Sequence, residues 1–136
     1  MRVLIVDDES LARNRLRRLL IETSPAPSAI MEAANAAEAL RAIASAASMG
    51  APFDVVLLDI HMPGQTGMEL AQTLQTQPGA PAIVFVTAHT QHALTAFEVS
   101  ATDYLTKPVR RERLAAALQK VELIAQARSA QTAKST

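Results

Sequence analysis

Short apolar runs alternate along this chain with longer segments in which apolar residues recur every three or four positions. A continuous apolar run bounded by turn residues predicts a strand buried on both faces of a sheet, and the wider spacing predicts an amphipathic helix. Strands are expected at residues 3–6, 29–33, 55–58, 83–86 and 103–105. Helical stripes are expected at 12–20, 36–47 and 70–74, with further helices over about 90–99 and from about 110 to 125.

Strands that alternate with helices favour a parallel sheet, because parallel strands need crossover connections that place helices on both faces. Right-handed crossovers leave few arrangements, and we expect the α/β, flavodoxin-like strand order 2-1-3-4-5 with five helices on both faces. One domain over residues 1–125 accounts for these elements. Residues 126–136 lose the apolar stripe and are expected as frayed helix or linker.

Polar residues mark where three of the predicted helices begin. Ser10 is expected to cap the first helix, because its hydroxyl oxygen can accept from a backbone N–H of the first turn. Asn35 with Glu38, and Thr66 with Glu69, have the spacing of a capping box.

The composition excludes several classes of protein. The chain has 136 residues, of which 49% are apolar, and no apolar run is long enough to span a membrane. It contains no cysteine, which excludes disulfides and thiolate metal sites. No signal peptide is recognised at the start, and a cytoplasmic location is expected.

The charge pattern argues against nucleic-acid binding by this segment. The 13 acidic residues balance the 13 basic ones, so no net positive charge attracts a polyanion. The arginines between Arg13 and Arg18 are interpreted as a solvated helix face, and the run from Arg110 to Arg113 is interrupted by Glu112. We therefore expect that residues 1–136 alone do not bind DNA specifically.

Chemically reactive residues follow four of the predicted strands. Parallel strands place their carboxyl ends along one rim, where open α/β sheets bind ligands. Hard carboxylate oxygens suit Mg²⁺, and a lysine ammonium with a hydroxyl group suits a phosphoryl group, which Asp59 could accept as an acyl phosphate. The residues on this rim are Asp7, Asp8, Asp59, Thr87 and Lys107.

Together these motifs resemble a response-regulator receiver domain over residues 1 to about 125. The resemblance rests on four stretches, namely Asp7-Asp8-Glu9, the run from Leu57 to Gly64, Val86-Thr87-Ala88 and Lys107-Pro108. The sequences of residues 96–101 (AFEVSA), 103–105 (DYL) and 107–109 (KPV) are most similar to those of receivers of the LytR/AlgR group.

The resemblance implies a role for each matching position. Asp59 corresponds to the phosphoacceptor. Asp8 corresponds to the main Mg²⁺ carboxylate and Asp7 to one that acts largely through water, while Asp59 and the backbone carbonyl of His61 complete the protein ligands. Lys107 corresponds to the phosphoryl-binding lysine, and its bond to Pro108 is expected to be cis. The remaining correspondences are the switch hydroxyl of Thr87, the switch aromatic ring of Tyr104, and rate-tuning side chains at His61 and His89.

The resemblance also implies partners. A sensor histidine kinase or a small phosphodonor would supply the phosphoryl group, and the chain would act as a signalling switch that catalyses only its own phosphotransfer and dephosphorylation. Receivers of this group usually precede a LytTR DNA-binding domain that regulates transcription; the alternative is a stand-alone receiver that acts through protein contacts only. A homodimer is expected through helix 4, strand 5 and helix 5, around residues 93–97, 103–105 and the start of the last helix.

Two other function classes fit the residues less well. A phosphatase or phosphotransferase that uses Asp59 would need a second acid two residues later, where His61 stands, and a cap insertion that the short loops exclude. A nucleotide- or flavin-binding module would need a glycine-rich first turn in place of Asp7-Asp8-Glu9. His89 and His92 lack a third ligand in the sequence pattern and are interpreted as polar surface.

Overall fold

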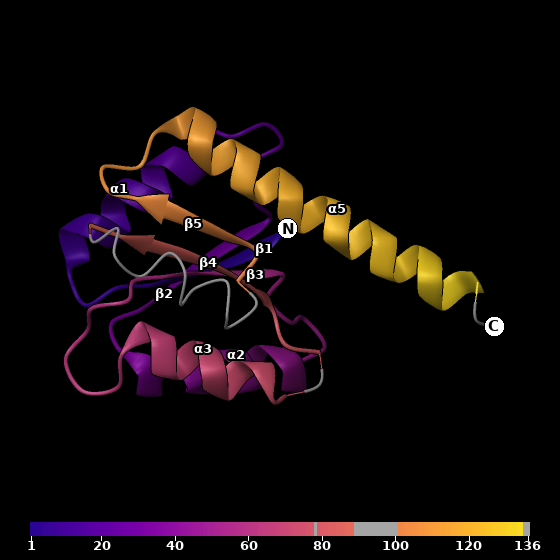
Figure 1. Cartoon of the computed structure of the whole chain (residues 1–136), viewed down its shortest axis with the longest axis horizontal. Helices are drawn as coiled ribbons and strands as arrows, with labels where there is room; N and C mark the ends of the chain where they lie inside the picture. The colour runs from indigo at the N-terminus through magenta and orange to yellow at the C-terminus, as the bar shows by residue number, and fades with distance from the viewer. Residues whose placement is uncertain (78, 89–100, 135–136) are drawn as a thin grey trace.

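Five parallel strands form one sheet in the computed structural model, which describes residues 1–77, 79–88 and 101–134 (Figure 1). The strand order β2-β1-β3-β4-β5 is the predicted one. The strands are β1 (Arg2–Val6), β2 (Ala29–Ala33), β3 (Val55–Leu58), β4 (Ala82–Thr87) and β5 (Asp103–Thr106).

Helices cover both faces of the sheet, with α1 and α5 on one face and α2 and α3 on the other (Figure 1). The described residues contain four helices rather than the predicted five, because the helix expected at 90–99 lies outside them. None of the helices in the described ranges has the length and apolar character needed to cross a membrane. The helices are α1 (Ser10–Ile21), α2 (Ala36–Ser48), α3 (Gly67–Gln75) and α5 (Arg111–Lys134).

The last helix is longer than its apolar stripe suggested. From the sequence, residues 126–136 were expected as frayed helix or linker. In the structure, α5 continues through Lys134. Its last turns extend away from the sheet (Figure 1). The segment 126–134 is rich in alanine and other good helix formers and contains neither glycine nor proline, which accounts for the continuation of the helix.

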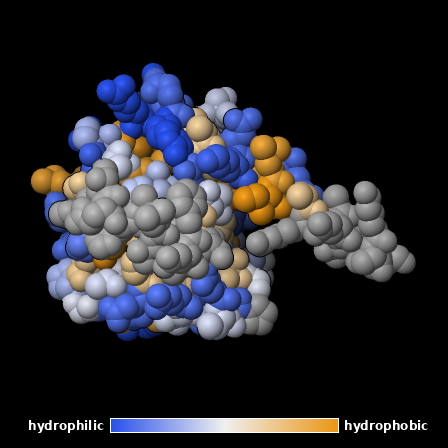
Figure 2. All heavy atoms as spheres, viewed as in Figure 1, coloured by the Kyte–Doolittle hydropathy of each residue, from blue (hydrophilic) through white to orange (hydrophobic). Residues whose placement is uncertain are grey.

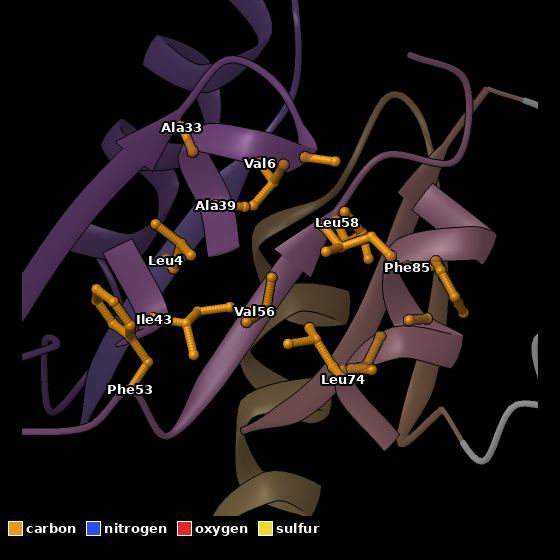
Figure 3. Close-up of a cluster of buried hydrophobic side chains, with 14 of the residues drawn as sticks. Leu4, Val6, Ala33, Ala39, Ile43, Phe53, Val56, Leu58, Leu74 and Phe85 are labelled. Atoms are coloured by element: carbon orange, nitrogen blue, oxygen red, sulfur yellow. The ribbon is translucent and has the colours of Figure 1, made fainter. Parts of the chain in front are cut away.

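The strands are buried on both faces because successive side chains point to opposite sides of the sheet. Leu4 and Val6 point toward α2 and α3, with Val56, Leu58 and Phe85 beside them (Figure 3). The alternate residues of the same strands pack with α1 and α5, and they are Val3, Ile5, Val55, Leu57, Val84 and Val86. Two apolar layers therefore hold the sheet rigidly and fix where each strand ends.

Two of the three predicted caps are confirmed. The Asn35 side chain accepts from the N–H of Glu38, and Thr66 and Glu69 form a complete capping box. The expected cap at Ser10 is wrong, because the turn after β1 leaves Glu9 as the extended residue before the helix, and Ser10 is already helical.

A buried carboxylate paired with two partly exposed cations joins β5 to α5. Asp103, which is only 6% exposed, accepts hydrogen bonds from both ends of the Arg113 guanidinium, at 2.6 and 2.8 Å, and the Lys120 Nζ lies 3.4 Å away. Burial alone would raise the pKa of Asp103, but the bonds from Arg113 and from the Tyr104 N–H, with the charges of Arg113 and Lys120, hold that pKa below its ordinary value.

The start of α3 lies against the backbone of Asp59. The Gly67 N–H donates to the carbonyl of Ile60 at 2.9 Å, and a Cβ on Gly67 would lie only 2.0 Å from the carbonyl oxygen of Asp59. Only glycine fits this contact, so α3 supports the turn that presents Asp59.

We expect Asp103→Asn to lower the free energy of unfolding by about 1.5 kcal/mol at pH 7, because a charge-assisted hydrogen-bonded pair is lost. Since the pKa of Asp103 is lowered by folding, its contribution is present above an unfolded value of about 4 and is lost as the pH falls through the lower folded value. Urea unfolding should therefore show a constant difference between pH 7 and 5 that shrinks below pH 4. Lys120→Met, which removes the longer and more exposed contact, is the control and should cost less than about 0.5 kcal/mol.

Gly67→Ala should destabilise the protein by about 3 kcal/mol, because the new methyl group must displace the backbone of Asp59 or Ile60. Gly50→Ala is the control: its φ of 74° also disfavours a side chain, but no atom lies within 4 Å of the new Cβ. Its expected cost is about 1 kcal/mol. Equal midpoints for the two variants in urea unfolding would contradict the assigned contact.

Candidate functional site

Three carboxylates gather at the carboxyl ends of β1 and β3. Asp7 and Asp8 follow β1, Asp59 follows β3, and each contributes an oxygen so that the three atoms lie within 4.8 Å of one another. Asp7 is 1% exposed and Asp59 is 7% exposed, whereas Asp8 is open to solvent. The register of β1 with β3, in which Val6 pairs with Leu58, brings the two strand ends together as predicted.

Lys107 enters the same site from the end of β5. Its Nζ donates to an oxygen of Asp7 at 2.7 Å and lies 3.7 Å from an oxygen of Asp59. The N–H of Lys107 also donates to the carbonyl of Thr87 at 2.8 Å, which joins the ends of β4 and β5. The peptide bond between Lys107 and Pro108 is cis, as expected from the resemblance.

The electrostatic environment of the site raises the pKa of both Asp59 and Lys107, for different reasons. Burial raises the pKa of Asp59, and the charge of Asp7 adds to this effect, while Lys107 and the N–H groups of His61 and Ile60 oppose it. Burial alone would lower the pKa of Lys107, but its bond to Asp7 and the charge of Asp59 raise that pKa above its ordinary value. Lys107 therefore stays charged, and the ionised form of Asp59 is less favourable in this site than it would be in water.

The chemistry of this donor set fits a magnesium ion. Oxygen atoms of Asp7, Asp8 and Asp59 are hard ligands, and all three lie close enough to share one cation. Lys107 contacts two of the three carboxylates, so a divalent cation would offset the burial, and the repulsion from Asp7, that raise the pKa of Asp59. The predicted contribution of the His61 carbonyl stays a prediction.

The two predicted switch residues lie on neighbouring strands. Thr87 is fully buried as the last residue of β4. Tyr104 is half-buried on β5, in register with Phe85, and the two rings lie 6.5 Å apart. Their roles as a switch stay predictions, as does the role of His61. The predictions for His89, His92 and residues 93–97 concern positions outside the described residues.

Two contributors to the site were not recognised in the sequence. Arg13, which was assigned to a solvated face with Arg17, donates to the backbone carbonyl of Asp7 at 2.6 Å. Both arginines also bind Glu32 of β2. The available signals were their spacing of four positions, which puts them on one helix face, and a single acid within strand β2. The other contributor is Gly67, which lies against the backbone of Asp59. Glycine is unfavourable in a helix, so its presence at the start of a predicted helix was the available signal of a close contact.

Comparisons with known proteins support the same interpretation. A family model described as the response regulator receiver domain matches residues 3–119. The positive alginate biosynthesis regulatory protein of Pseudomonas aeruginosa is 49% identical over 120 residues, which cover 88% of this chain and 46% of that protein. The sensory transduction protein LytR of Staphylococcus epidermidis is 42% identical over 123 residues, which cover 90% of this chain and 46% of that protein. The chain thus spans about half the length of these relatives.

Solved structures share the fold. The response regulatory domain of protein mrkE from Klebsiella pneumoniae has a TM-score of 0.73 at 31% identity, covering 91% of this chain and 97% of that one. The response regulator TrrA from Thermotoga maritima, solved in complex with Mg²⁺-BeF, has a TM-score of 0.72 at 28% identity, covering 88% of this chain and 97% of that one. With the family model matching residues 3–119, these likenesses show that the chain belongs to the response regulator receiver domain family and is similar to regulators of the LytR/AlgR group.

Proposed function

We propose that this receiver accepts a phosphoryl group on Asp59 with the help of Mg²⁺. The observation that carries the proposal is the placement of Asp59, a buried carboxylate with a charged lysine 3.7 Å away and two further carboxylates within metal-binding distance. A bound Mg²⁺ would neutralise negative charge as the phosphoryl group approaches the acids.

The chain's own residues would perform the transfer. A carboxylate oxygen of Asp59 attacks phosphorus, an oxygen–phosphorus bond forms, and the bond from phosphorus to the donor breaks with its electron pair leaving on the donor. Lys107 would bind an oxygen of the transferred group, which places the lysine between the phosphoryl group and Asp7. Asp7 and Asp8 would hold the metal, with Asp59 and the His61 carbonyl. Hydrolysis of the acyl phosphate would later return the free carboxylate.

The donor is proposed to be a sensor histidine kinase or a small phosphodonor such as acetyl phosphate, and a cytoplasmic location is proposed with it. Transfer from a protein requires contact around the rim of the site. A cleft of about 390 Å³ opens there beside Lys107, lined mainly by apolar residues of α1 and of the segment after β5. Leu11, at its edge, is 80% exposed and offers an apolar contact for such a partner.

The output is proposed to be control of transcription. Relatives named as regulators are about twice as long as this chain, and they favour an attached output over the alternative of a stand-alone receiver. In this proposal DNA is bound by a LytTR domain of the full-length protein and not by residues 1–136. Several basic side chains of this domain are already paired with acids: Arg13 and Arg17 with Glu32, Arg111 with Glu22, and Arg113 and Lys120 with Asp103.

Thr87 and Tyr104 are proposed to link phosphorylation to the surface. The Thr87 hydroxyl would move toward the phosphoryl group, and Tyr104 would turn inward behind it, so that the two side chains form one element with two positions. The surface of β5 and of the start of α5 would then favour a homodimer, and the expected contribution of residues 93–97 lies outside the described residues.

Incubation with acetyl phosphate and Mg²⁺ should add the mass of one phosphoryl group, and EDTA should suppress the reaction. Asp59→Asn should abolish the addition, because the nucleophile is lost. Asp54→Asn is the matched control, since Asp54 lies at the opposite end of β3 and bonds the N–H of Arg2. Intact-protein mass spectrometry gives the result; labelling of Asp59→Asn at the level of Asp54→Asn would rule out Asp59 as acceptor.

Thr87→Ala should leave phosphorylation possible and abolish the dimerisation that phosphorylation promotes. Sedimentation velocity with the beryllofluoride adduct should show a dimer for the original chain and a monomer for Thr87→Ala. Thr76→Ala is the control, because Thr76 is an exposed threonine at the end of α3, which covers the face of the sheet opposite α5. Mass distributions that are the same with and without the adduct in the original chain would contradict the proposed switch.

A further inference from the structure

Arg13 reaches from the first helix to the backbone of the acidic turn. Its Nη1 donates to the carbonyl oxygen of Asp7 at 2.6 Å, and its Nε donates to a carboxylate oxygen of Glu32 at 3.0 Å. The side chain is only 17% exposed, so most of its length is held among neighbouring groups. Two of its three nitrogens thus have fixed partners on two different elements of the fold.

The carbonyl that Arg13 holds belongs to the peptide group joining Asp7 to Asp8. Because a peptide group is planar, the direction of this carbonyl fixes the direction in which the backbone enters Asp8. Asp8 is exposed, and within the described residues no hydrogen bond holds its carboxylate, so the backbone at Asp8 sets the position from which this carboxylate can reach the other two acids. Asp8 is nevertheless one of the three acids whose oxygens lie within 4.8 Å of one another.

Other bonds hold the rest of the turn. The N–H of Asp7 donates to the carbonyl of Ala33 at 3.1 Å, and the N–H of Glu9 donates to the Asp7 carboxylate at 2.9 Å. The second Asp7 carboxylate oxygen accepts from Lys107. These bonds fix the position of Asp7. The orientation of the peptide group between Asp7 and Asp8 is fixed by the bond from Arg13.

Glu32 sets the direction of the Arg13 guanidinium. Glu32 lies on β2 in register with Ile5, two residues before Asp7, and its two oxygens accept from Arg13 and from Arg17. Although burial opposes it, the bonds and charges of the two arginines lower the pKa of Glu32, so the carboxylate is ionised at neutral pH. Arg17 also donates to the carbonyl of Ile30 at 3.2 Å, which holds the far side of Glu32.

We propose that Arg13 is a positioning residue for the metal site, which aims the Asp8 carboxylate at Asp59 by holding the Asp7 carbonyl, with Glu32 as its anchor. The inference rests on the proposed Mg²⁺ site and adds to it residues of α1 and β2 that touch neither metal nor phosphoryl group. Groups that orient metal ligands from behind typically change metal affinity 10- to 100-fold when they are removed.

The test compares two arginines that share Glu32 but differ in their contact with the turn. Arg13→Met keeps the aliphatic stem and removes the bond to Asp7, and we expect the Mg²⁺ dissociation constant of the full chain to rise about tenfold. Arg17→Met removes an equivalent bond to Glu32 and leaves the Asp7 carbonyl held, so the dissociation constant should stay within about twofold. Isothermal titration calorimetry with MgCl₂ alone measures both, without any phosphodonor.

Two further variants decide between the possible causes. Arg13→Lys keeps the positive charge but cannot bond Asp7 and Glu32 with a planar fork, so it should restore only part of the affinity. Full restoration by lysine would replace the positioning role with a simple charge effect and overturn the proposal. So would equal changes in Arg13→Met and Arg17→Met, which would reflect general destabilisation of the α1–β2 contact.

Failure of the inference is distinguishable from failure of the metal site itself. Asp8→Asn should weaken Mg²⁺ binding severely whatever the role of Arg13 is. If the original chain binds no Mg²⁺, the proposed metal site fails, and the inference with it. If the chain binds Mg²⁺, Asp8→Asn weakens the binding and Arg13→Met does not, only the role of Arg13 is overturned.

Discussion

The crowding of three carboxylates at one edge of the sheet is the constraint on which the rest of this structure depends. Asp7 and Asp59 are buried, and Lys107 is the cation that contacts both. Burial, with the charge of Asp7, raises the pKa of Asp59, which shows that Lys107 does not fully compensate the acids. The burial of two apolar layers stabilises the fold against the unfavourable free energy of this crowding. These layers hold β1 and β3 in register, so that the acids cannot move apart.

Features that depend on local sequence pattern were predictable. The strands followed from apolar runs too continuous for a one-sided sheet, and the caps at Asn35 and Thr66 followed from residue spacing. The strand order was one of the few arrangements that right-handed crossovers allow. The meeting of Asp7, Asp8, Asp59 and Lys107 followed from the parallel arrangement, since each residue lies within two positions of the carboxyl end of a strand.

Features that depend on distance between elements were not predictable. Arg13 and Arg17 resemble solvated residues until the register of β2 with β1 places Glu32 beside them. The need for glycine at position 67 is explained only by the structure, in which the carbonyl of Asp59 lies where a Cβ of residue 67 would be. The cap at Ser10 failed for a similar reason, because the shape of the acidic turn decides which residue is extended.

The second half of α5 extends beyond the sheet (Figure 1), so a small change in the direction of the helix moves its far end by a larger distance. The helix begins four residues after Lys107, and Arg113, Leu114, Ala117 and Val121 attach its first half to the sheet. Leu123 and Ile124 are 57% and 41% exposed, and Figure 2 shows apolar surface on α5 where the helix leaves the body. At 1.5 Å per residue, its 24 residues extend about 36 Å. The part beyond Val121 is about 20 Å long, so a rotation of about 5° where the helix leaves the sheet would displace its far end by roughly 1.7 Å.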